Sequence, residues 1–259
     1  MDDKYETQRR AAIAKRKKTE QDYRDRAAQN LAGHEYTCLV KQDNLVAWRC
    51  QTPKTTAYAF DILMTRFGIA VVGDIDNLTF SVGQGYGIDF LAGDDVTYYL
   101  HTKLSEVCKK RSFSEHLFRE ALMRNIAQAL HEECEGEMFD LLPEWLQDPD
   151  RADAVHWPEF RQLVLDKRRD MSHIDDRWMH WDDALDEAHE IAFTEEAMIF
   201  MRDNSEVLCL GDDWYENRVD EPSQGLVQCL YMINHAAKAI VAQMANATEA
   251  AETHSGSAA

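Results

Sequence analysis

Residues 58–64 read Tyr-Ala-Phe-Asp-Ile-Leu-Met, with a large apolar side chain at every second position. That period is typical of a strand with one buried face. Upstream, the apolar runs 36–41 and 45–50 flank Asp43-Asn44, a dipeptide that suits a tight hairpin turn. Downstream, residues 69–72 and 78–82 form two more short runs around the turn-like residues 73–77. The pattern predicts a five-stranded antiparallel meander over residues 35–83.

From about residue 93 the apolar residues recur at helical spacing. Ser112 and Glu115 have the spacing of a capping box, which predicts a helix start at that point. The chain is therefore expected to have an α+β fold, with a small sheet followed by a larger helical part over 94–246. The predicted helices cover residues 94–109, 112–130, 157–169, 173–191, a segment beginning at 194, and 223–246.

The two ends of the chain differ from the rest in composition. Residues 1–32 contain nine basic and six acidic side chains and few large apolar ones, which predicts a charged helical arm. We expect this arm to dock through charge on its own chain or on a second copy, giving a homo-oligomer. Residues 33–246 are expected to form a single domain. Residues 247–259 contain no bulky apolar side chain and are expected to form a disordered tail.

The charge of the chain is large and local. The formal net charge is −19, and residues 132–221 alone contain 28 acidic and 8 basic side chains. This balance excludes a generic basic nucleic-acid binder and disfavours docking on anionic membranes. It favours a partner protein with a basic surface, and it also allows imitation of nucleic-acid charge. A solvated acidic face that keeps the protein soluble is the alternative interpretation.

Three features bear on where the protein acts. No apolar run reaches the length of a membrane span, and the start MDDKYETQRR lacks the apolar core of a secretory signal. The six cysteines contain no C-x-x-C pair, which is typical of reduced thiols. We therefore expect a cytoplasmic protein without contact to a membrane.

The densest group of titratable side chains lies in residues 173–189. On a helix, Asp176, His180, Asp183 and Glu187 share one face, and such a group could bind a divalent metal. The alternative hypothesis is thus a metal-dependent enzyme that acts on nucleic acid or nucleotides. No H-E-x-x-H pattern accompanies these residues, and a surface helix rich in Asp and His is the simpler interpretation.

Other motifs do not identify a catalytic residue or a cofactor. The segment Gly83-Gln84-Gly85-Tyr86-Gly87 is similar to part of a phosphate-binding loop, but no Lys-Ser or Lys-Thr pair follows it. A flexible connector between sheet and helices explains it better. No G-x-S-x-G motif is present either. We expect neither a catalytic site nor a cofactor.

A resemblance to a known family is confined to residues 45–105. Trp48-Arg49-Cys50, Tyr58-x-Phe60-x-Ile62 and the run 71–75, followed by Tyr98-Tyr99 and Lys103-Leu104, resemble uncharacterised proteins of tailed bacteriophages and prophages. The resemblance implies a phage accessory protein, expressed in the host cytoplasm, that binds and inhibits a host defence protein. A virion assembly factor is the other role considered. The residues expected to contact the partner lie in the acidic region: Asp175, Asp176, Asp182, Asp183, Asp186, Glu187, Glu190, Asp212, Asp213 and Trp214.

Overall fold

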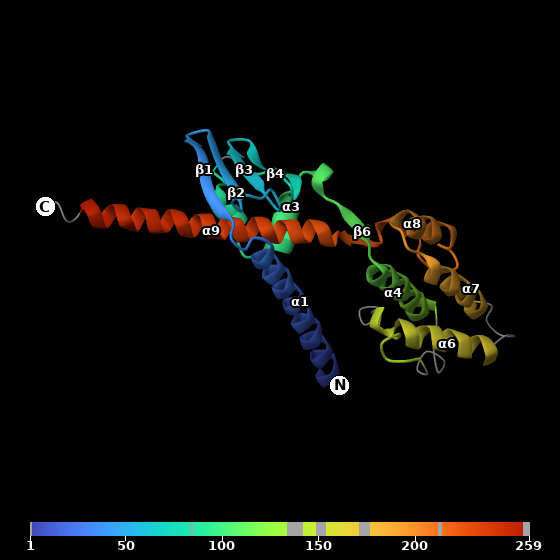
Figure 1. Cartoon of the computed structure of the whole chain (residues 1–259). Coiled ribbons are helices and arrows are strands. Elements are labelled where there is room, and N and C mark those ends of the chain that lie inside the picture. The colour runs from blue at the N-terminus through green and yellow to red at the C-terminus, as the bar shows by residue number, and fades with distance from the viewer. Residues whose placement is uncertain are drawn as a thin grey trace. The chain divides into compact units, whose positions relative to one another are not determined.

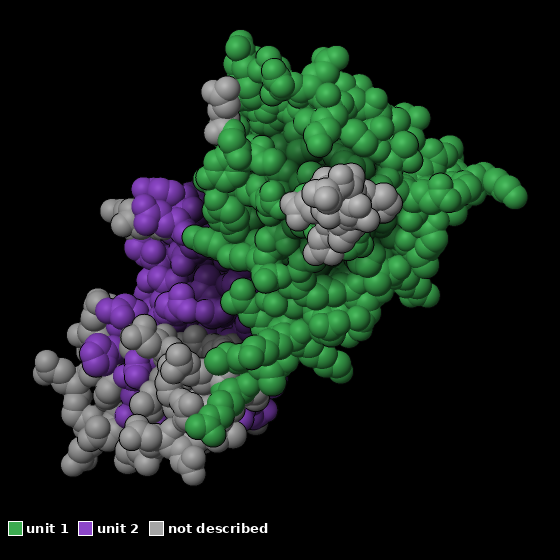
Figure 2. All heavy atoms as spheres, turned by 90° about the vertical axis from the view of Figure 1, so that its left-hand side faces the viewer, with its two compact units in different colours: residues 1–110, 222–259 green, residues 111–221 purple. Residues whose placement is uncertain are grey.

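The computed structural model describes residues 2–83, 85–133, 142–148, 154–170, 177–211 and 214–255. The chain divides into two compact units (Figures 1 and 2). Unit 1 contains residues 1–110 and 222–259, and unit 2 contains residues 111–221. The single domain expected over 33–246 is thus replaced by two units. The chain leaves unit 1 after Lys110 and returns at Pro222, so unit 2 is inserted into unit 1.

The sheet of unit 1 is the predicted antiparallel meander. Its five strands pair in sequence order, each with the next one along the chain. The strands are β1 (Glu35–Gln42), β2 (Leu45–Gln51), β3 (Phe60–Thr65), β4 (Gly68–Gly73) and β5 (Asp76–Phe80). As expected, Asp43 and Asn44 form the turn between β1 and β2. The α+β fold class is confirmed.

The period of two along β3 has the predicted consequence for packing. Phe60, Ile62 and Met64 are buried, whereas Asp61 and Leu63 between them are only partly so. The buried face joins side chains of the short helix α2 (Ile88–Ala92) and of the long helix α9 (Gln224–Ser255) in one apolar core. The buried amide of Asn234 in α9 donates to the carbonyl oxygens of Leu91 and Gly93, at 2.7 Å each. This bond pair fixes α9 against the end of α2.

Helix α1 (Asp2–Asn30) is held by burial as well as by charge. Ala27 and Leu31 are fully buried in the core of unit 1, and the ring of Tyr23 stacks on that of Tyr231 in α9 at 5.5 Å. The arm was expected to dock mainly through charge because its apolar stripe is thin; at its C-terminal end, however, burial also holds it. Residues 13–19, in contrast, are exposed, and Figure 1 shows this part of α1 extending away from the rest of unit 1.

Two helix predictions in unit 1 need correction. Residues 94–109 form a helical segment, Val96–Lys103, and a 3₁₀ turn, Glu106–Cys108, instead of one helix. The break arises because Leu104 forms a β-bridge with Phe80 and the amide of Ser105 donates to the Thr79 carbonyl at 2.8 Å. At the other end, α9 continues to Ser255, past the predicted end at 246, so the disordered tail expected over 247–259 is wrong for residues 247–255. Residues 247–255 contain Ala, Glu and Thr but no Gly or Pro, so nothing in the sequence stops the helix before Gly256.

Unit 2 is helical in the part that the structure describes. Its main helices are α4 (Glu115–Glu133), α6 (Trp157–Asp170), α7 (Arg177–Glu190) and α8 (Thr194–Asp203). A two-stranded ladder of β6 (Arg111–Phe113) and β7 (Asp220–Pro222) lies where the chain enters and leaves the unit. Helix α4 begins at Glu115, three residues after the predicted start at Ser112, because Ser112 lies in β6 and Ser114 accepts the amide N–H of Leu117 instead. The starts at Trp157 and Thr194 agree with the sequence pattern.

Candidate functional site

The division into units separates the charge of the chain completely. Unit 2 contains 30 acidic and 11 basic side chains, whereas the residues of unit 1 include 17 of each sign. The net charge of −19 therefore belongs to unit 2 alone. The helical α1 and α9 both belong to the neutral unit. The excess of acidic residues is therefore confined to unit 2 and does not extend to the helices of unit 1.

Helix α7 presents the predicted acidic face to solvent. His180, Asp183, Glu187 and Glu190 recur at helical spacing and are all exposed. Neither Glu187 nor Glu190 forms an ion pair with any residue that the structure describes. The same helix buries Trp178, Trp181 and Leu185 in the core of unit 2. The core-facing side fixes the helix, and the charged stripe remains accessible.

Two other carboxylates of α7 form ion pairs with arginines of α6. In this respect they differ from Glu187 and Glu190 of the stripe. Asp182 pairs with Arg168, and its side chain is only 8% exposed. Asp186 pairs with Arg161 and is 64% exposed. The hydrogen bond and the charge of Asp182 raise the pKa of Arg168. Asp182 is therefore a structural carboxylate that joins α6 to α7, although the sequence placed it among the partner-contacting residues.

The metal site predicted on this face is not assembled in the described part of the chain. Asp176 lies outside the described residues, and no group of three His, Cys, Asp or Glu side chains within them is placed to hold a metal ion. The Arg168 guanidinium also lies 3.6 Å from a carboxylate oxygen of Asp183. A fixed cation at that distance opposes the binding of a second cation.

Exposed apolar side chains also occur just before and within α8 (Thr194–Asp203), the next helix along the chain after α7. Phe193 is 66% exposed and Ile199 is 52% exposed. Glu195 and Glu196 are exposed beside them, and Glu196 accepts the Ala192 amide N–H at 3.2 Å. An aromatic and an aliphatic side chain among carboxylates form a mixed surface of the kind that occurs in protein interfaces.

The remaining predicted contact residues are placed in part. Asp175, Asp212 and Asp213 lie outside the described residues, as does Asp176. Trp214 begins a 3₁₀ turn and is partly buried against the core of unit 2. Its ring meets that of Tyr215 edge-on at 5.9 Å, and Tyr215 is the more exposed of the two. Tyr215 is thus the more accessible aromatic of the two, although Trp214 was the one expected to contact the partner.

Unit 1 contains a cavity of about 320 Å³ that the sequence did not predict. Its walls come from the β1–β2 turn, the β3–β4 turn, the glycine-containing segment 85–87 and the exposed part of α9. The segment predicted to be a connector therefore also lines a cavity. The lining residues are Lys41, Asp43, Asn44, Leu45, Val46, Trp48, Met64, Thr65, Arg66, Gly85, Tyr86, Gly87, Ile88, Asp89 and Met244.

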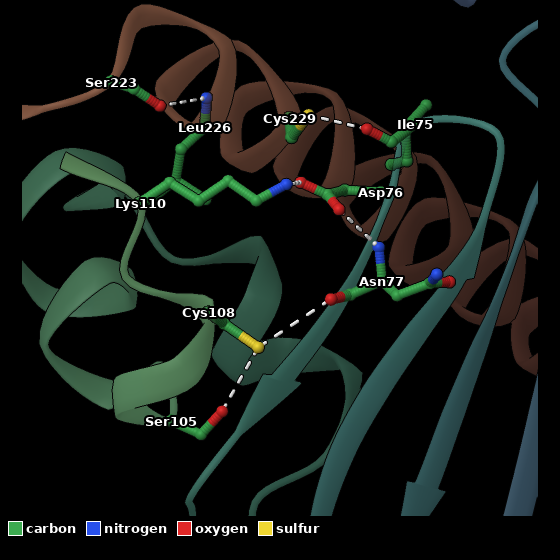
Figure 3. Close-up of polar contacts among 9 residues, drawn as sticks. All are labelled: Ile75, Asp76, Asn77, Ser105, Cys108, Lys110, Ser223, Leu226 and Cys229. Carbon is green, nitrogen blue, oxygen red and sulfur yellow. Dashed lines mark hydrogen bonds and ion pairs between the residues drawn. The ribbon is translucent and has the colours of Figure 1, made fainter. Parts of the chain in front are cut away.

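A cluster of polar side chains around the β4–β5 turn of unit 1 has a structural role (Figure 3). Lys110 pairs with Asp76 at 2.6 Å, and the thiol of Cys229 donates to the Ile75 carbonyl at 2.9 Å. Burial raises the pKa of the Asp76 carboxyl, but hydrogen bonds from Lys110 and from a backbone amide outweigh burial and leave it below its usual value. Burial likewise raises the pKa of Cys229 to about 11, so this thiol is protonated and unreactive at neutral pH. The group ties α9 to the β4–β5 turn beside the point where the chain leaves unit 1.

Comparisons with protein-family models, curated proteins and solved structures find no match to this chain. The described helices also include none that is long and apolar enough to cross a membrane.

Proposed function

We propose that this chain is a binding protein whose unit 2 engages a basic surface on a partner protein. The observation that carries the proposal is the separation of charge, with the whole net charge of −19 in unit 2 and none in unit 1. A charge concentrated on one compact body steers an oppositely charged partner and raises its association rate. The exposed stripe of α7 and the exposed apolar residues Phe193 and Ile199 of the following segment supply the contact surface.

The stripe is suited to recognition because part of it is not neutralised internally. Arginines of α6 already bind Asp182 and Asp186, whereas Glu187 and Glu190 form no ion pair with a described residue. Phe193 and Ile199 add apolar area that a purely electrostatic encounter lacks. A basic partner with an exposed apolar side chain would satisfy both features.

The resemblance to phage proteins supplies the narrower form of this proposal. In that form the protein acts in the host cytoplasm, and its partner is a host defence protein that uses a basic surface to bind nucleic acid. The acidic stripe would then occupy that surface and inhibit the partner without a chemical step. No direct contact with nucleic acid or with a membrane is part of the proposal.

The test compares partner capture by two matched variants of the full chain. Glu187→Gln with Glu190→Gln removes two negative charges from the stripe of unit 2. Asp22→Asn with Glu35→Gln removes two from exposed positions in unit 1. Each variant serves as bait in bacterial lysate at low and at high salt.

The unit 2 variant should lose the specific partner at a lower salt concentration than the wild type, because screening then acts on fewer attractive pairs. The unit 1 variant should retain the wild-type profile. Equal effects of the two variants, or capture that does not depend on salt, would refute the proposed surface.

A further inference from the structure

The cavity of unit 1 has the composition of a small-molecule site. Its inner surface is apolar, with Trp48, Met64 and Ile88 buried and Val46 beside them. Its volume of about 320 Å³ lies at the lower end of the range for small-ligand sites, roughly 300–1,000 Å³. The apolar area favours a ligand with an apolar body over a fully polar one.

The rim of the same cavity carries charge of both signs. Lys41 and Arg66 supply the cations, and Asp43 and Asp89 supply the carboxylates. None of these four side chains forms an ion pair with another residue in the described part of the chain. Arg66 instead lies over the ring of Phe67 at 4.5 Å, beside the cavity and not across it. Both signs of charge thus remain available to a ligand.

One wall is fixed in place by aromatic packing. Tyr86 meets Phe90 edge-on at 5.4 Å, and Phe90 in turn meets Tyr99 at 5.7 Å. A hydrogen bond with Tyr86 and partial desolvation raise the pKa of the Tyr99 hydroxyl. Tyr86 is thus held by a ring contact with Phe90 and by a hydrogen bond with Tyr99.

Two glycines of the loop, Gly85 and Gly87, line the cavity. A β-carbon built at either position would meet no other atom within 4 Å, so a larger side chain has space there. The backbone of Gly87 has φ −113°, which every residue type adopts. Glycine at this position is therefore not required by backbone strain, and its small size leaves room at the wall.

We propose that this cavity binds a small zwitterion with an apolar body, of the chemical class of the free apolar amino acids. Its carboxylate would face Lys41 and Arg66, its ammonium group would face Asp43 and Asp89, and its side chain would contact Trp48. A ligand with only one charge would leave one pair of rim charges without a counterpart. The site lies wholly within unit 1, so it is independent of the acidic surface of unit 2.

The experiment uses the full chain with ¹³C-labelled methionine methyl groups, since Met64 and Met244 line the cavity and report on it directly. The probes are L-phenylalanine, N-acetyl-L-phenylalanine, L-phenylalaninamide and glycine. L-phenylalanine should shift the resonances of both methionines in a saturable manner. The N-acetyl compound lacks the ammonium group and the amide lacks the carboxylate, so each should bind roughly 1.5- to 5-fold more weakly. Glycine, which has no apolar body, should cause no shift.

Two variants connect these shifts to the cavity. Gly87→Leu fills space at the wall and should abolish the shifts. Gly83→Leu is the matched control, because Gly83 does not line the cavity and a β-carbon there also meets no other atom. The double variant Lys41→Met, Asp43→Asn changes two exposed positions, one near the end of β1 and one in the β1–β2 turn. It should weaken binding of L-phenylalanine to the level of the singly charged probes.

The proposal is overturned if L-phenylalanine leaves Met64 and Met244 unshifted at millimolar concentration. It is equally overturned if the singly charged probes bind as tightly as L-phenylalanine, or if binding persists in both the Gly87→Leu and the Lys41→Met, Asp43→Asn variants.

Discussion

Replacing Leu31 by alanine should unfold unit 1 at a distinctly lower temperature. Leu31 lies just after α1, is 2% exposed and belongs to the core of unit 1. Leu→Ala changes at such buried positions cost about 2–5 kcal/mol, the sum of lost apolar burial and of the cavity left behind. At this chain length each kcal/mol lowers the melting temperature by about 2–4 °C, so the expected decrease is roughly 4–20 °C.

The matched control is Ile13→Ala on the exposed part of the same helix, where the side chain is 46% exposed. This change should alter stability by no more than ~0.5 kcal/mol. Because the two units need not unfold together, the assay is scanning calorimetry combined with hydrogen exchange of β1–β5 amides. Similar melting of the Leu31→Ala variant and the wild type would show that charge, and not burial, holds α1. Removal of residues 2–19 should leave the sheet intact and, if the arm mediates self-association, should abolish only that.

Three further predictions follow from single contacts. Burial and, to a smaller extent, a neighbouring histidine lower the pKa of His235 below 6.5, so the unfolded chain binds a proton more readily. Unit 1 should therefore lose stability as the pH falls below about 6.5, and His235→Gln should flatten that dependence of the urea midpoint. Iodoacetamide at neutral pH should label the exposed Cys38 well before Cys229, as peptide mass mapping would show. Arg168→Ala should lower the melting temperature of unit 2 more than Arg161→Ala, because it leaves a carboxylate only 8% exposed without its cation, against one 64% exposed.

The parts of the fold that local pattern determines were predictable. Alternation along β3 and the Asp43-Asn44 turn predicted the meander, because strand period and turn chemistry act between near neighbours. The segment 94–109 has a helical apolar period, yet Leu104 and Ser105 bond to β5 instead. The spacing of the apolar residues within 94–109 does not show that this segment pairs with a strand more than twenty residues away. The break in the helix could therefore not be predicted.

The same distinction applies to the candidate sites. The exposed stripe of α7 was predictable in part, since the helical spacing placed His180, Asp183 and Glu187 on one face. Glu190 was expected only as an acidic contact residue, without a place on that face. The binding of Asp182 by Arg168 was not, because it depends on how α6 packs on α7. The cavity of unit 1 is lined by four segments that lie apart in the sequence. Of these, only the glycine-containing segment was noted as a motif in the sequence.

The boundaries between the two units coincide with a change in the balance of acidic and basic residues along the sequence. They do not coincide with a change in the spacing of the apolar residues. The chain leaves unit 1 at Lys110 and returns at Pro222, and on either side of unit 2 the acidic and basic residues balance. Helix α9 lies beyond the return point and is as helical as α7, yet it belongs to the neutral unit. Negative charge is therefore a property of unit 2 as a folded body and not of helices in general. For this reason, removing two carboxylates from unit 2 should change the salt dependence of partner binding, whereas removing two from unit 1 should not.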